Sequence, residues 1–126
     1  MGQNLTLLPL QDPRSLTLSF VMCLDCLRFD RDYAIFKQLI CLYDDSGREP
    51  TIKAIPIPPQ MWVWIVGEHK DSQGTREDKH GNGLTFVYAQ QLKQLEVVDN
   101  TSVKNKAIKA YINALPDDTP FILYWS

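Results

Sequence analysis

The two histidines of the chain, His69 and His80, both fall in a hydrophilic segment that spans residues 67–83. Asp71 and Asp78 lie close to them in the sequence. Histidine titrates near neutral pH, and a neighbouring carboxylate can orient the imidazole ring or share a cation with it. One hypothesis is therefore a metal-binding module, or a small metal-dependent enzyme, that uses His69, Asp71, Asp78 and His80.

The spacing of these groups matches no familiar catalytic or metal-binding motif. The residues after Asp71 lack the ligand run and the closing glutamate of a calcium loop. The chain also lacks the His-Glu-x-x-His pattern of zinc proteases and a glycine-rich phosphate loop. Acid–base catalysis requires positioned groups, and a solvated loop positions none. We therefore predict no catalytic residue and no cofactor, and we interpret 67–83 as a long hydrophilic hairpin loop.

Cys23 and Cys26 are separated by two residues, as in zinc knuckles and redox motifs. Only Cys41 and the two histidines could complete a set of four zinc ligands, and no second pair has ligand spacing. Buried, inert thiols are the simpler interpretation, and zinc stays open. Because three cysteines do not suggest a disulfide scaffold, we expect a reducing, cytoplasmic environment.

Trp62 and Trp64 alternate with Met61, Val63 and Ile65 along an apolar run. Side chains alternate between the two faces of a strand, so one set should face the helices while the other is partly exposed. Tryptophan is strongly enriched at binding hot spots. We predict a protein-binding surface on this strand and the adjacent loop, formed by Trp62, Trp64, Glu77, Asp78, His80 and Tyr88. Burial of the tryptophans in the core or in a homodimer is the competing interpretation.

Length and composition indicate one domain, residues 1–126, that can bury a core without disulfides or metal. The hydrophobic fraction of 44% and the charged fraction of 22% are those of a globular protein. The net charge of −2 gives no general attraction to nucleic acid or to anionic membranes. No apolar run approaches the roughly 20 residues that a transmembrane helix requires. We therefore expect a protein partner rather than nucleic acid or a membrane.

The first half of the chain predicts strands and one helix. Residues 5–10 are apolar but contain Pro9, which favours an edge strand or an extended arm. Strict alternation predicts a strand over 15–24. Asp30 can cap a helix whose apolar positions recur at spacings of three and four, namely Tyr33, Phe36, Leu39, Ile40 and Tyr43. Residues 51–57 alternate weakly, and Pro56, Pro58 and Pro59 remove backbone donors, so this piece should lie at a sheet edge or form an extended crossing before residue 61.

The second half predicts a hairpin, two helices and a final strand. The runs 61–66 and 84–89 should pair with each other, and the second should continue into a short helix. Thr101 or Ser102 can cap a further helix, with an inner face of Ala107, Ile108, Tyr111, Ile112 and Leu115 and an outer face of Lys104, Lys106 and Lys109. The continuous apolar run 121–125 predicts a central strand.

These elements predict an α+β fold, in which helices pack on one face of a single mixed or antiparallel sheet. The chain also resembles a loose group of small phage-encoded proteins. The resemblance rests on Arg31, Tyr33 and Phe36 in the first helix, on the prolines of 55–59, and on His80 before Thr85 and Leu92. It departs from that group after Pro59, where Gly-x-Pro is usual, and between His80 and Thr85, where a tryptophan is common.

The resemblance implies a phage or mobile-element origin and transfers no functional residue. Together with the absence of a catalytic motif, it leads to the hypothesis of a non-enzymatic, cytoplasmic accessory protein that binds a host protein. Two alternatives stay open, namely the metal-dependent enzyme or module described above and a structural subunit that forms a homo-oligomer.

Overall fold

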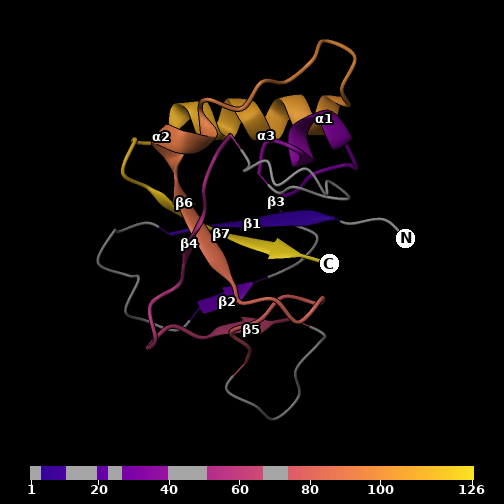
Figure 1. Ribbon diagram of the computed structural model, residues 1–126. Coiled ribbons are helices and arrows are strands. Elements are labelled where there is room, and N and C mark those ends of the chain that lie inside the picture. Colours follow the sequence, from indigo (N-terminus) through magenta and orange to yellow (C-terminus); the bar gives the residue numbers. More distant parts are fainter. Residues whose placement is uncertain (1–3, 11–19, 23–26, 40–50, 67–73) are drawn as a thin grey trace.

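The computed structural model describes residues 4–10, 20–22, 27–39, 51–66 and 74–126 (Figure 1). Several sequence-based predictions fall outside these described residues. They concern Cys23, Cys26, Cys41, His69, Asp71, most of the strand predicted at 15–24, and the helix predicted after residue 39.

The main sheet has five antiparallel strands in the order β3-β1-β7-β6-β4. Its strands are β1 (Leu5–Pro9), β3 (Leu27–Arg28), β4 (Ile55–Pro56), β6 (Thr85–Tyr88) and β7 (Pro120–Trp125). Helices cover one face of the sheet, so the predicted α+β class is confirmed (Figure 1).

The central position of β7 follows from its composition. Its sequence, Pro-Phe-Ile-Leu-Tyr-Trp, has no polar face that could be turned to water, and all six residues are buried. The strand pairs with β1 on one side, where Leu7 lies opposite Leu123, and with β6 on the other. The prediction of a central strand is confirmed, as is the edge position of β4.

The edge position predicted for residues 5–10 is wrong, because β1 lies between β3 and β7. Asn4 and Leu10 both bond to the β7 side, through Ser126 and Pro120. Alternation then directs the nitrogen of Pro9 to the β3 side. There β3 pairs only with Thr6 and Leu7, so the missing N–H of Pro9 interrupts no ladder.

Three helices form the layer above the sheet: α1 (Tyr33–Phe36), α2 (Ala89–Leu92) and α3 (Val103–Ala114). The rings of Phe36 and Trp125 meet edge-to-face with centroids 5.4 Å apart, which joins α1 to the centre of the sheet. Ser102 caps α3 as predicted, by accepting a hydrogen bond from the backbone of Asn105. The cap of α1 is Asp32 rather than the predicted Asp30.

The inner face of α3 differs from the predicted one. Ile108 and Ile112 are buried as expected, whereas Ala107 is exposed and Tyr111 is 43% exposed. Asn105 takes the third inward position, since its side chain bonds to the backbone of Asp30. Burial of a polar residue was not predicted. The buried face of α3 therefore consists of Asn105, Ile108 and Ile112, and it does not include Ala107 or Tyr111.

A second sheet covers the face of the main sheet that is opposite the helices. It consists of β2 (Phe20–Met22) and β5 (Val63–Ile65), which run parallel (Figure 1). The predicted pairing of the 61–66 strand with the 84–89 strand is wrong, because β4 and β7 occupy both edges of β6. Instead, β5 lies on the face of the main sheet and packs against its side chains.

The molecule therefore has three layers: helices, the five-stranded sheet and the two-stranded sheet (Figure 1). One buried cluster lies between the helices and the main sheet. The other lies between the two sheets, with Met61, Val63 and Ile65 fully buried against Phe86 and Ile122. No helix within the described ranges is both long and apolar enough to cross a membrane.

Candidate functional site

The outward side of β5 carries the two tryptophans that the sequence singles out. Met61, Val63 and Ile65 point inward, so alternation directs Trp62, Trp64 and Val66 outward. We call these three outward residues the Trp face. Both tryptophans are half-buried and Val66 is 50% exposed. The inward set was expected to face the helices, but it contacts the main sheet instead, because β5 belongs to a separate layer.

Arg76 lies against the Trp face and is held there by backbone carbonyl groups. Its guanidinium carbon is 5.9 Å from the centroid of the Trp62 ring, within the range of a cation–π interaction. Nη1 donates to the carbonyl oxygen of Pro58 at 2.7 Å and also to that of Met61. Nη2 donates to the carbonyl of Ile57 at 3.4 Å. These bonds fix the position of a permanently charged group beside an aromatic ring.

The backbone of residues 74–76 runs beside β5 and brings Arg76 to this position. Val63 and Thr75 exchange two hydrogen bonds, of 3.0 and 2.7 Å. Gly74 has a φ of +104°, and a Cβ there would lie 2.3 Å from the carbonyl oxygen of Val63. Only glycine combines this φ with so close an approach. The described part of the predicted loop is thus hydrogen-bonded to the strand that precedes it.

Sequence analysis missed Arg76. It appears in the sequence as one of several charged residues in a hydrophilic segment, and no local spacing links it to Trp62 or to the carbonyl groups of 57–61. The proline-rich composition of 55–59 is the only relevant signal. Prolines remove backbone donors, and so they leave carbonyl groups that need another partner.

Glu77, Asp78 and His80 come together in one turn at 77–83. Asp78 Oδ1 accepts hydrogen bonds from the backbone N–H groups of His80, at 2.9 Å, and Asn82, at 3.1 Å. The N–H of Lys79 donates to the carbonyl of Trp125, which attaches the turn to the end of β7. Glu77 and His80 are exposed and Asp78 is half-buried. We call these residues the acidic turn.

Tyr88 was predicted to extend the binding surface. Its ring packs edge-to-face on Phe86, with centroids 5.6 Å apart, and it contacts the cluster between the two sheets. Tyr88 also precedes α2, where its backbone N–H donates to the side chain of Gln91. Its half-buried ring therefore supports the inner packing of the site.

The alternative metal site is only partly visible. Asp78 and His80 are neighbours in the acidic turn, and one oxygen of Asp78 is already used by two backbone donors. Among the residues described by the structure, no group of three or more His, Cys, Asp or Glu side chains is arranged to hold a metal ion. His69 and Asp71 lie outside that part of the chain.

Comparison with protein-family models, with curated proteins and with solved structures found no match. The resemblance to small phage-encoded proteins therefore stays a prediction, and the function has to be argued from the residues of this chain.

Proposed function

We propose that this chain is a non-enzymatic binding protein that recognises a protein partner through the Trp face, Arg76 and the acidic turn. The observation that carries the proposal is the fixed position of Arg76 beside Trp62 on the outer layer of the molecule. Tryptophan and arginine are the residue types most enriched at the energetic centres of protein interfaces.

Fixed side chains favour binding because association has to order whatever is mobile. Ordering a flexible side chain at an interface costs about 0.5–1.5 kcal/mol. The carbonyl groups of Pro58 and Met61 already hold Arg76 in one position. Trp64 lies two residues further along the same face of β5, so the patch combines apolar area with a positioned cation.

The acidic turn defines the chemistry expected of the partner. Glu77 follows Arg76 directly and is exposed, and Asp78 is two residues away. A partner that fits has an apolar pocket for a tryptophan and basic side chains at its rim, since complementary charges speed encounter and fix the orientation. The phage resemblance supports a host protein as the partner. The odd number of cysteines, three, does not suggest a disulfide scaffold and supports a cytoplasmic location.

The test is affinity purification from a host lysate, followed by a direct affinity measurement on each purified candidate. We expect one partner to bind the parent protein at least about tenfold more tightly than it binds the Trp64→Ala variant, because a hot-spot truncation costs about 2 kcal/mol or more. Tyr33→Ala is the matched control, since Tyr33 is an aromatic residue that is 60% exposed on α1, in the helical layer. Equal binding by folded Trp64→Ala protein would refute the proposed surface.

The homo-oligomer is separated from this proposal by mass. Sedimentation of the parent protein and of the Trp64→Ala variant should give the mass of one chain for both. A parent dimer that dissociates in the variant would assign the Trp face to a second copy of the chain instead of a different protein.

A further inference from the structure

We propose that a pocket at the N-terminal end of α3 binds a phosphate group, as carried by a phosphate monoester or by inorganic phosphate. The pocket has a volume of about 350 Å³ and is lined by Asn4, Arg28, Phe29, Asp30, Arg31 and Lys104. Three cationic side chains thus meet one carboxylate in a chain whose net charge is −2. The site lies in a different part of the molecule from the Trp face and does not depend on the protein-binding proposal.

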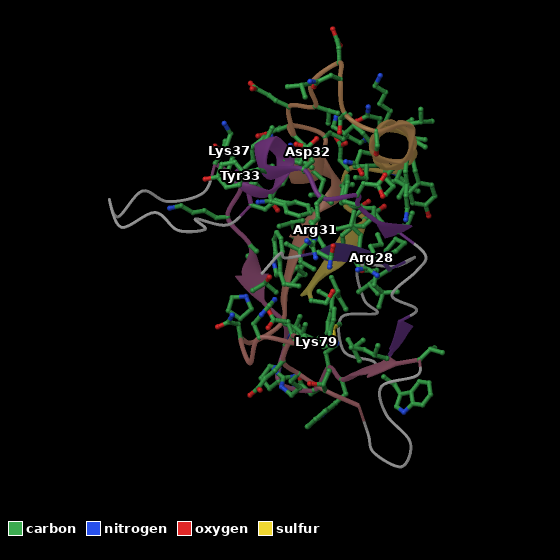
Figure 2. All side chains as sticks on the ribbon, turned by 90° about the vertical axis from the view of Figure 1, so that its right-hand side faces the viewer. Arg28, Arg31, Asp32, Tyr33, Lys37 and Lys79 are labelled. Atoms are coloured by element: carbon green, nitrogen blue, oxygen red, sulfur yellow. The ribbon has the colours of Figure 1, made fainter. Side chains whose placement is uncertain are left out.

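The cations of the pocket come from two segments that are far apart in the sequence. Arg28 belongs to β3, and Arg31 follows in the connection to α1. Figure 2 shows both arginines near the middle of one face, with Lys79 below them and Lys37 above. Lys104 is the second residue of α3, at the end where the helix dipole is positive. All three charges therefore favour an anion in the space between β3 and α3.

Arg31 is oriented for a ligand by a neighbouring side chain. Its Nε donates to Oδ1 of Asn4 at 3.2 Å. Among the described residues its two terminal nitrogens make no further hydrogen bond, and the side chain is exposed. A guanidinium that is held at Nε keeps the flat pair of terminal nitrogens available, and this pair matches two oxygens of a phosphate.

The segment that carries the arginines is rigidly attached to the fold. The N–H of Phe29 donates to the carbonyl of Leu5 at 3.0 Å. The side chain of Asn105, only 1% exposed, accepts from the N–H of Asp30 at 2.8 Å and donates to its carbonyl at 3.1 Å. Thr101 donates to the carboxylate of Asp32. Residues 29–32 are therefore fixed before any ligand arrives.

The size and charge of the pocket indicate the ligand class. A volume of about 350 Å³ lies at the low end of small-molecule sites, which run from about 300 to 1,000 Å³. Arg31 and Lys104 alone carry more positive charge than the single carboxylate of Asp30 balances, and they suit a phosphate that carries a charge near −2 at neutral pH. Lys104 supplies a point charge, and among the described residues it has no ion-pair partner. A compact phosphate fits these conditions better than a long polyanion.

Asp30 gives the proposal its sharpest test. Asp30 lines the pocket and its negative charge repels an anion, whereas its hydrogen bonds to Asn105 are made by its backbone N–H and carbonyl. The Asp30→Asn substitution should therefore leave the fold intact and tighten phosphate binding about threefold, which corresponds to about 0.6 kcal/mol and lies within the range of exposed charge pairs. An increase in affinity cannot result from misfolding.

The experiment is a titration of the full chain with inorganic phosphate and, separately, with glycerol phosphate, followed by backbone amide NMR at constant ionic strength. We expect saturable shifts at Asn4, at 28–31 and at 103–105. Arg31→Ala should weaken binding about tenfold, because a hydrogen-bonded charge pair contributes about 1.5 kcal/mol or more. Lys106→Ala is the control, because it removes the same charge from an exposed position of α3 outside the pocket.

Binding of inorganic phosphate alone would assign the site to the free ion, and binding of both probes would assign it to monoesters. The proposal is overturned if neither probe gives saturable shifts, or if Lys106→Ala weakens binding as much as Arg31→Ala does. It is also overturned if a short single-stranded oligonucleotide binds, with shifts that extend to Lys37 and Lys79, while both small phosphates do not.

Discussion

Asn105 and Arg76 do similar work in opposite layers of the molecule, but in different chemical settings. Each side chain holds the backbone of a segment that is distant in sequence, since Asn105 binds Asp30 and Arg76 binds the carbonyl groups of 57–61. Asn105 is neutral and buried, and it satisfies one donor and one acceptor of the same residue. Arg76 is charged and half-buried, and it can only donate.

The difference separates stability from function. A buried neutral amide is costly to remove because its partners lose both the hydrogen bond and access to water. A half-exposed guanidinium is cheaper to remove, since water can replace it at the carbonyl groups. We therefore expect the Asn105 contact to stabilise the fold, and the Arg76 contact to contribute mainly to the surface that it borders.

Replacement of Asn105 by alanine should have the larger effect. The backbone N–H and carbonyl of Asp30 would lose their partner inside the protein, at a cost of about 3 kcal/mol in the free energy of unfolding. Urea unfolding followed by tryptophan fluorescence measures this loss. Lys106→Ala, at an exposed position of the same helix, is the matched control and should change stability by no more than about 0.5 kcal/mol. Similar losses of unfolding free energy in the two variants would contradict a stabilising role for the hydrogen bonds between Asn105 and Asp30.

Replacement of Arg76 by alanine should cost less stability, about 1 kcal/mol in the same measurement, because the three carbonyl groups become accessible to water. Its effect on partner affinity should exceed its effect on stability. Arg76→Lys should recover only part of the affinity, because an ammonium group cannot donate from two fixed nitrogens. A loss of stability as large as that of Asn105→Ala would show that the contacts of Arg76 and Asn105 stabilise the fold equally, and would contradict a mainly functional role for Arg76.

Short-range patterns in the sequence predicted several of the strands and helices. They did not predict which strands pair when those strands lie far apart in the sequence. The run 121–125 can only be central because it has no polar face, and Ser102 caps α3 through a bond three residues away. The partner of β5 could not be predicted in this way. Alternation shows that the strand has two faces, but it does not show whether the strand pairs with β6 or lies across the main sheet.

The candidate site was predicted in the same uneven way. Trp62, Trp64 and the residues of the acidic turn could be selected from the sequence by their residue types, and all of them lie in the described part of the chain. Arg76 and Arg31 gain their roles from atoms far away in sequence, namely the carbonyl of Pro58 and the side-chain oxygen of Asn4. Asn105 looks like a polar interruption of an apolar stripe until its partner at Asp30 is known.

Lys109 makes a third contact between a side chain and a distant backbone segment. It lies on the same helix as Asn105 but is charged, as Arg76 is. Its ammonium group donates to the carbonyl of Lys93 at 2.9 Å and to Oδ1 of Asn113 at 3.1 Å. Partial burial lowers the pKa of Lys109 below its ordinary value of 10.5. Between the lowered pKa and 10.5, the unfolded chain binds more protons at this site than the folded chain does, so this group makes stability rise with pH in that window.

Replacement of Lys109 should have the smallest effect, and the direction of that effect follows from the lowered pKa of Lys109. Lys109→Met keeps the aliphatic stem and removes the titration, so the variant should lack the part of the alkaline rise that Lys109 contributes. The measurement is the difference in unfolding free energy between the parent and the variant, from neutral pH to about pH 10.5, because subtraction cancels the other lysines and the tyrosines. Lys106→Met, at an exposed position of the same helix, is the matched control. If the difference in unfolding free energy between the parent and Lys109→Met does not change with pH, the ammonium group of Lys109 is well solvated, as the guanidinium of Arg76 is. Only the contact of the neutral Asn105 would then depend on burial.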